Sequence, residues 1–81
     1  MRGFTMEFKE LFRECRIKHF LTQRNMAQKL NVPVSTLKSW EQGTAIPNYE
    51  NWLKIKEIYT SNEIDIEKLE ELYLQRKLKK K

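Results

Sequence analysis

Cysteine, glycine, proline and histidine are scarce in this sequence: its 81 residues include one Cys, two Gly, two Pro and one His. A single cysteine excludes an internal disulfide, as is usual for proteins of a reducing compartment. The scarcity of glycine and proline argues against long loops and β-hairpins. Apolar runs stay well short of the roughly 18–20 residues of a membrane span, and the N-terminal MRGFTMEF lacks the apolar region of a signal peptide. We therefore expect a cytoplasmic protein with no membrane partner.

The sequence also lacks the residue clusters of catalytic and metal sites. The sequence has one histidine and one cysteine, too few to form a metal site, so we interpret His19 as an exposed residue at a helix end rather than a metal ligand or pH switch. Cys15 lies on an apolar stripe, which favours inert burial over a nucleophilic or redox role. No glycine-rich phosphate loop is present. We expect no enzyme activity, no bound metal and no cofactor.

The net charge of +5 is unevenly distributed along the chain. Residues 1–46 carry eight Lys/Arg against four Glu, residues 47–75 carry three Lys against seven acids, and residues 76–81 carry five bases and no acid. The basic first half suits a polyanionic partner. The basic residues 76–81 either contact phosphates or form a solvated helix end, and we interpret Arg2 as part of a disordered start rather than an arm in the minor groove.

Apolar residues recur at helical spacing along most of the chain, and the alternating pattern of strands is absent. We predict helices over about residues 6–18, 23–30, 33–42, 48–59 and 66–78. The residues suited to cap these helices are Thr5, Thr22, Asn48 and Asp65, and those suited to end them are Asn31 and Gly43. The expected fold class is all-α: residues 1–81 form one domain, a compact bundle of five short helices whose core covers about residues 6–59.

Each predicted helix has one apolar face. The expected core residues are Phe8, Leu11, Phe12, Cys15, Met26, Ala27, Leu30, Val34, Leu37, Trp40, Trp52, Leu53, Ile55, Ile58, Ile66, Leu69, Leu72 and Tyr73. We assign both tryptophans to the core rather than to stacking on bases, because they follow the helical spacing. Leu74 and Leu78 are left over, and we interpret them as a homodimer interface rather than as scattered exposed leucines.

Residues 21–43, LTQRNMAQKLNVPVSTLKSWEQG, predict two short helices joined by a tight turn, with small and polar residues on the open face of the second helix. This layout is that of a helix-turn-helix, whose second helix enters the DNA major groove. Residues 8–58 resemble the phage Cro/repressor-type (XRE-like) helix-turn-helix DNA-binding family. The resemblance is carried by an ordered set at the family spacing: Leu21-Thr22-Gln23, Ala27, Leu30, Val32, Ser35-Thr36-Leu37, Trp40-Glu41-Gln42-Gly43 and Pro47.

The resemblance implies a lambda-repressor-like DNA-binding domain that binds double-stranded operator DNA as a homodimer, and we expect a transcriptional repressor. It implies base contacts from the helix at about residues 33–42, by Val34, Ser35, Lys38 and Ser39. It implies contacts to DNA phosphates by Thr22, Gln23, Arg24, Thr36, Gln42 and Thr44. It also implies an ion pair between Arg16 and Glu41 that holds this helix on the rest of the domain.

Some positions depart from the family pattern. Phe20 and Asn31 stand where relatives often have glycine, and Val34 and Ser35 stand where many have long polar or basic side chains. Short side chains must lie close to the bases they contact, so we expect affinity to depend mainly on phosphates and DNA shape. The alternative function is a protein-interaction module, such as an antitoxin-like partner binder, which the acidic residues 50–71 and the surplus leucines suggest.

Overall fold

The computed structural model of the chain describes residues 7–59 and 63–79, with side chains for residues 7–59 and 66–78. In these residues the chain forms five helices: α1 (Phe8–Lys18), α2 (Gln23–Leu30), α3 (Val34–Gln42), α4 (Tyr49–Ile58) and α5 (Glu63–Lys79). The described residues contain no strand. The prediction of an all-α bundle of five helices is therefore confirmed.

Local side-chain chemistry sets the ends of the second, third and fourth helices. Thr22 and Asn48 cap α2 and α4, and each side chain accepts a hydrogen bond from the backbone N–H three residues later, at 3.0 and 2.9 Å. Asn31, with φ of 60°, ends α2, and Gly43, with φ of 86°, ends α3. Both residues adopt the left-handed conformation that stops a helix. These predicted caps and stops are confirmed.

The predicted start of the first helix is wrong. α1 has Glu7 as its N-cap and begins at Phe8, two residues later than expected. The Glu7 N–H donates to Oε1 of Glu10 at 2.9 Å, half of the reciprocal bonding by which a residue in the first turn caps its own helix. The earlier candidate cap, Thr5, lies outside the described residues, as does Arg2.

The predicted start of the last helix is also wrong. α5 begins at Glu63 rather than at about Ile66, so Asp65 lies inside the first turn and is not the cap. An acid is favoured by the positive end of the helix dipole both at the cap and throughout the first turn. Composition alone therefore does not distinguish these two positions.

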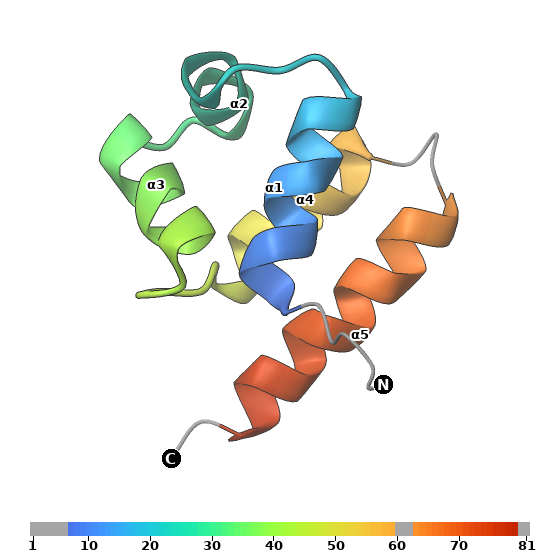
Figure 1. Cartoon of the computed structure of the whole chain (residues 1–81). Coiled ribbons are helices and arrows are strands. Elements are labelled where there is room, and N and C mark those ends of the chain that lie inside the picture. The colour runs from blue at the N-terminus through green and yellow to red at the C-terminus, as the bar shows by residue number, and fades with distance from the viewer. Residues whose placement is uncertain (1–6, 60–62, 80–81) are drawn as a thin grey trace.

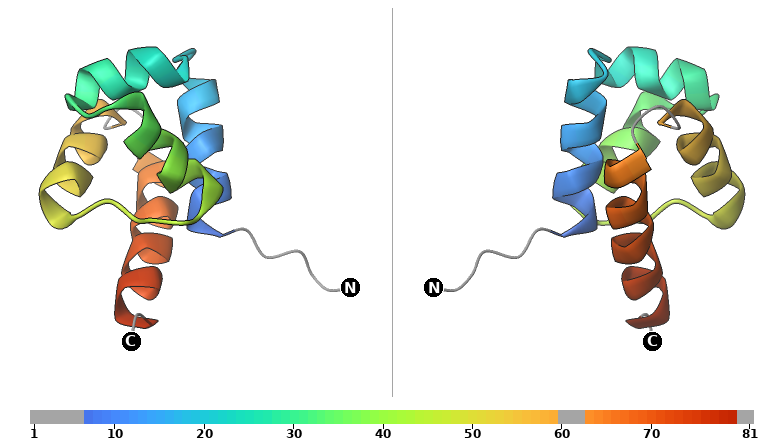
Figure 2. Two further views of the ribbon diagram at one scale, coloured as in Figure 1. Left: turned by 90° about the vertical axis from the view of Figure 1, so that its left-hand side faces the viewer. Right: turned by 90° about the vertical axis from the view of Figure 1, so that its right-hand side faces the viewer.

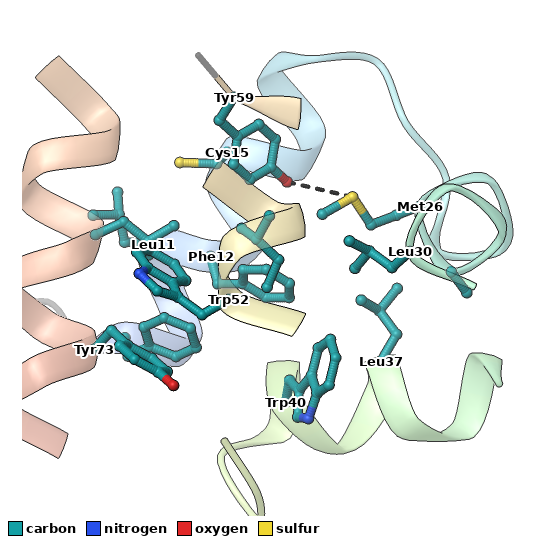
Figure 3. Close-up of a cluster of buried hydrophobic side chains, with 14 residues drawn as sticks. Leu11, Phe12, Cys15, Met26, Leu30, Leu37, Trp40, Trp52, Tyr59 and Tyr73 are labelled. Carbon is teal, nitrogen blue, oxygen red and sulfur yellow. Dashed lines mark hydrogen bonds between the residues drawn. The ribbon is translucent and has the colours of Figure 1, made fainter. Parts of the chain in front are cut away.

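Buried side chains from all five helices meet in one hydrophobic core (Figure 3). Its buried hydrophobic residues are Phe8, Leu11, Phe12, Cys15, Met26, Ala27, Leu30, Leu37, Trp40, Trp52, Ile55, Tyr59, Leu69 and Tyr73. Trp52 stacks on Tyr73 with ring centroids 4.7 Å apart, and Phe12 meets Trp40 edge-on at 6.1 Å. Both tryptophans are core residues, as predicted. Leu53, also predicted to be inside, is 43% exposed because the buried stripe of α4 runs through its neighbours Trp52 and Ile55.

The helices divide the bundle into two sides. α2 and α3 lie together on one side, and α5 crosses the opposite side (Figures 1 and 2). α1 lies between them and packs against both α3 and α5, while α2 packs against α3 and α4. The C-terminal part of α5 projects beyond the other helices (Figure 2).

The connection between α1 and α2 contains a strained residue. Phe20 has φ of 58°, in the left-handed region, and its side chain is 93% exposed. A side chain in this conformation costs roughly 1–2 kcal/mol relative to the right-handed region, and the exposed ring gains no burial in return. Glycine adopts this conformation without strain, which agrees with the glycine that the resemblance implies at this position.

Candidate nucleic-acid interface

A short turn fixes the angle between α2 and α3. The N–H of Asn31 donates to the Gln28 carbonyl at 3.1 Å, and the N–H of Val32 donates to the Ala27 carbonyl at 3.0 Å. Pro33 follows as the N-cap of α3, with φ of −64° and ψ of 149°, the extended backbone that is usual for an N-cap. Ala27 is 1% exposed, and its small side chain lets the two helices approach closely. The result is that α3 lies across the open side of the bundle, below α2 (Figure 2, left).

The helix α3 has a buried side and an open side. Leu37 and Trp40 are 0% and 3% exposed and point into the core (Figure 3). Ser35, Lys38 and Gln42 are exposed on the open side. Of the residues that the sequence suggested for base contacts, Ser35 and Lys38 are therefore accessible to a ligand.

The other two suggested base-contact residues are partly engaged within the chain. Val34 is half-buried and packs against the core. Ser39 is half-buried, and its hydroxyl donates to the carbonyl of Thr36 at 2.7 Å. Because a hydroxyl has one proton, Ser39 in this conformation can only accept a hydrogen bond from a base.

The suggested phosphate contacts lie near the starts and ends of α2 and α3. Thr22 and Arg24 are exposed at the start of α2, whose first turn contains no acid. The positive end of the α2 dipole is therefore not neutralised by a carboxylate of its own. Gln42 and Thr44 are exposed where α3 ends, and the Thr44 hydroxyl donates to the Ser39 carbonyl at 3.3 Å, as its N–H does at 3.1 Å. The hydroxyl must therefore rotate away from that carbonyl to donate to a phosphate.

Glu41 is the acid of α3, and it is neutralised within the chain. The guanidinium of Arg16 donates to Glu41 through Nε at 2.6 Å and through Nη2 at 3.1 Å, and its Nη1 donates to the Leu21 carbonyl at 2.9 Å. Only 4% of the Glu41 side chain is exposed. The ion pair suggested by the resemblance is thus present, and α3 presents no unpaired carboxylate on its open side.

The sequence did not indicate that Gln23 would join this ion pair. Its Nε2 donates to Oε1 of Glu41 at 3.0 Å, so the start of α2 is bonded to the end of α3. The amide keeps a second N–H and a carbonyl oxygen for a ligand. Gln23 therefore has a structural contact in addition to the phosphate contact proposed for it.

Two long-range bonds to helix ends were also missed by the sequence reasoning. Lys54 of α4 donates to the Leu30 carbonyl at 3.3 Å, and Arg76 of α5 donates to the Gly43 carbonyl at 2.9 Å. The donors lie 24 and 33 residues from their acceptors, so no local pattern indicates the pairing. The one available signal is the general preference of basic side chains for helix C-termini.

The residues considered for metal or redox chemistry are engaged in the core. His19 is half-buried rather than exposed, with Nδ1 2.9 Å from the Cys15 carbonyl and its ring 4.6 Å from that of Tyr59. Cys15 is 1% exposed. Across the part of the chain that the structure describes, no three His, Cys, Asp or Glu residues are grouped so as to hold a metal ion. None of the described helices is long and apolar enough to cross a membrane.

Comparison with known proteins identifies the helix-turn-helix formed by α2, the turn and α3. The family model for Helix-turn-helix, of the Cro/repressor and XRE-like type, matches residues 12–61, more than half of the chain. No curated protein and no solved structure matches the chain. The matched segment contains α2, the turn, α3 and both residues of the Arg16–Glu41 pair, and the family is one of DNA-binding regulators. The chain therefore belongs to the Cro/repressor-type (XRE-like) helix-turn-helix family.

Proposed function

We propose that this protein is a sequence-specific transcriptional repressor that places α3 in the DNA major groove. The observation that carries the proposal is the two-sided character of α3: Leu37 and Trp40 hold it from behind, while Ser35 and Lys38 are open to a ligand. The carboxylate of Glu41 is paired with Arg16, so the open side is not repelled by phosphates. This combination supports groove binding by a helix fixed in one orientation.

The open residues divide into base and phosphate contacts. In the proposed complex Lys38 donates a hydrogen bond to a guanine edge, and Ser35 contacts a neighbouring base. The Ser39 hydroxyl accepts a hydrogen bond from a base, and the exposed edge of Val34 contacts a thymine methyl group. The phosphate contacts come from Thr22, Gln23, Arg24, Thr36, Gln42 and Thr44. The chain carries a net charge of +5, so binding neutralises phosphates and releases counterions, and the affinity falls steeply with salt.

The proposed active form is a homodimer. Leu74 and Leu78 are 49% and 83% exposed on the C-terminal part of α5, and they are separated by one helical turn. Two such surfaces related by a two-fold axis would bury these leucines against each other. A dimer would set the two α3 helices about 34–36 Å apart, one turn of B-DNA, and predicts a palindromic operator.

Selection of bound sequences from random duplex DNA near physiological salt tests the proposal directly. We expect a palindromic site and a steep loss of affinity with rising salt. Lys38→Ala should weaken binding to that site by about tenfold, which corresponds to the loss of one good base contact, and Ser39→Ala should change the preferred sequence. The control is Lys68→Ala, which removes the same charge from an exposed position on α5. Equal affinity and preference for wild type, Lys38→Ala and Ser39→Ala would contradict the proposal.

A second candidate function is that of a protein-interaction module such as an antitoxin-like partner binder. It is favoured by the exposed apolar residues Tyr49 and Leu53 on α4, which are 65% and 43% exposed beside an acidic segment. A repressor should bind a palindrome in its own promoter unaided, whereas an interaction module should need a second polypeptide. Binding of promoter DNA by the purified chain, with and without the product of the adjacent gene, distinguishes the two.

A further inference from the structure

The basic side chains near the C-terminus of α3 come from other helices. Its last turn contains no basic residue but does contain the acid Glu41, an arrangement that the negative end of a helix dipole disfavours. Arg16 pairs with that acid. The side chain of Lys9 in α1 lies against Gly43, where a Cβ would come within 2.7 Å of the Lys9 Cδ. Arg76 in α5 bonds the Gly43 carbonyl itself.

Helix α5 bonds both ends of the loop that follows α3. Arg76 Nη2 donates to the Gly43 carbonyl at 2.9 Å, and the Tyr73 hydroxyl donates to the Pro47 carbonyl at 2.9 Å. The two donors are three residues apart and so lie on one face of α5. Tyr73 is 1% exposed and stacks on Trp52, which makes its end of this connection rigid. Thr44, a proposed phosphate contact, lies between the two bonded carbonyls.

We propose that Arg76 is a positioning residue for DNA binding: through the Gly43 carbonyl it fixes the last turn of α3 and the approach of Thr44 to the DNA backbone. This inference rests on the proposed function, because it concerns the same helix in the same groove. Arg76 is half-buried against the loop. It is two residues from both Leu74 and Leu78, a rotation of about 200° around the helix, so the leucines face away from it. One segment of α5 thus contacts the loop after α3 on one side and carries the proposed dimer surface on the other.

The competing explanation is that Arg76 acts only as one more positive charge for DNA phosphates. The two roles differ in what they change. Loss of a phosphate contact lowers the slope of log affinity against log salt by about one and weakens all sequences equally. Loss of a positioning bond leaves the slope unchanged, since no counterion is involved, and it reduces the discrimination of α3 between bases.

The experiment compares Arg76→Ala, Arg76→Lys and the control Lys77→Ala in the full chain. Lys77→Ala removes the same charge from the next, exposed position and leaves the Gly43 carbonyl bond in place. Each variant is measured for affinity to the selected operator across salt concentrations, for its base preferences, and for hydrogen exchange at the Thr44 amide. Circular dichroism establishes that each variant is folded. If Arg76→Ala unfolds, Arg76→Gln separates the two roles, because it removes the charge and keeps an N–H donor for the Gly43 carbonyl: a positioning role then predicts a retained base preference with an unchanged salt slope, and a phosphate contact predicts a slope lower by about one.

We expect Arg76→Ala to bind about three- to tenfold more weakly with an unchanged salt slope, broadened base preference and faster exchange at Thr44. Arg76→Lys should restore most of the affinity and preference, and Lys77→Ala should keep the wild-type preference. An Arg76→Ala protein that loses about one unit of salt slope and keeps its base preference would overturn the positioning role. If wild type itself selects no DNA sequence, the proposed function fails as well. If wild type selects a sequence and Arg76→Ala binds it with the same affinity and base preference, the proposed function stands and the positioning role fails.

Discussion

Arg16 and Glu41 form a bidentate ion pair across 25 positions of sequence, joining α1 to the last turn of α3. Their side chains are 11% and 4% exposed. Such a pair adds little to the free energy of unfolding compared with well-packed apolar side chains in its place, but removing one partner leaves the other charge largely without contact to water. The main effect of the pair is on orientation, since it fixes the last turn of α3 relative to α1.

Replacing one member of this pair should destabilise the fold strongly. We expect Arg16→Met to lower the free energy of unfolding by about 2–4 kcal/mol, because Glu41 then remains buried without its partner. The double variant Arg16→Met/Glu41→Leu should recover most of that loss. Urea unfolding followed by circular dichroism measures both.

The matched control is the pair of Lys56 and Glu70, whose charged atoms are 3.2 Å apart and whose side chains are 36% and 37% exposed. Lys56→Met should change stability by less than about 1 kcal/mol, because exposed pairs are screened by water. Similar losses for Arg16→Met and Lys56→Met would show that burial of the first pair has no energetic consequence.

Replacing Phe20 should stabilise the protein. Phe20→Asn keeps the left-handed backbone at lower cost, because asparagine tolerates this region, and sacrifices no buried surface from a ring that is 93% exposed. We expect a gain of about 0.5–1 kcal/mol, seen as a rise in Tm of roughly 2–8 °C. Phe20→Ala is the control, since it removes the ring but keeps a strained Cβ. A Tm that rises equally in both variants would assign the effect to the ring rather than to the backbone.

Substituting Gly43 should destabilise the end of α3. Gly43→Ala places a Cβ at φ of 86° and within 2.7 Å of the Lys9 Cδ, and we expect a loss of about 1–2 kcal/mol from the backbone strain. The Lys9 side chain is flexible and can move, so the double variant Lys9→Ala/Gly43→Ala should recover only a small part. Recovery of most of the loss in thermal unfolding would identify the side-chain contact as the main cause.

Stability should fall in alkaline solution because of a buried phenol. Burial, followed by the nearby Cys15 and Glu41, raises the pKa of Tyr59 above its ordinary value of 10.0. Below about pH 9 the phenol is protonated in both the folded and unfolded states. Above pH 10 only the unfolded state releases the proton easily, so stability is lost as pH rises, by at most about 1.4 kcal/mol per pH unit for this group.

Tyr59→Phe should make the decline above pH 10 shallower. The variant also loses the hydrogen bond from the Tyr59 hydroxyl to the Met26 sulfur at 3.7 Å (Figure 3), which we expect to cost less than about 1 kcal/mol at neutral pH. Met26→Leu, which removes the sulfur acceptor of the same bond but keeps the phenol, serves as the control and should keep the wild-type decline. Urea midpoints between pH 7 and 11 supply the comparison, and identical slopes for wild type and Tyr59→Phe would refute the prediction.

Disrupting the leucines of α5 should separate the proposed dimer without unfolding the monomer. Leu74→Glu/Leu78→Glu introduces like charges at the proposed two-fold contact, while both side chains are already exposed in the single chain. We expect wild type to sediment as a dimer and the variant as a folded monomer with much weaker binding to a palindrome. Leu53→Glu, at another exposed leucine, should remain dimeric. A monomeric wild type at micromolar concentration would remove the dimer from the proposal.

The sequence predicted the helices best where the local chemistry is distinctive. Thr22 and Asn48 are strong caps, and Asn31 and Gly43 are strong stops, so those boundaries were correct. Errors arose at Glu7 and at Glu63, because acids are favourable at several positions of a first turn.

What the sequence determined by itself is the all-α class, the buried stripe of each helix and the helix-turn-helix unit, because all three follow from spacing and capping over a few residues. The tertiary structure decided which distant groups meet: Gln23 with Glu41, Arg76 with the Gly43 carbonyl, and Tyr73 with the Pro47 carbonyl. It also decided that the Ser39 proton is used inside α3 and that Phe20 is left exposed and strained. Local periodicity places a residue on a helix face, but the partner that it meets depends on how whole helices pack, and that packing is a property of the complete core.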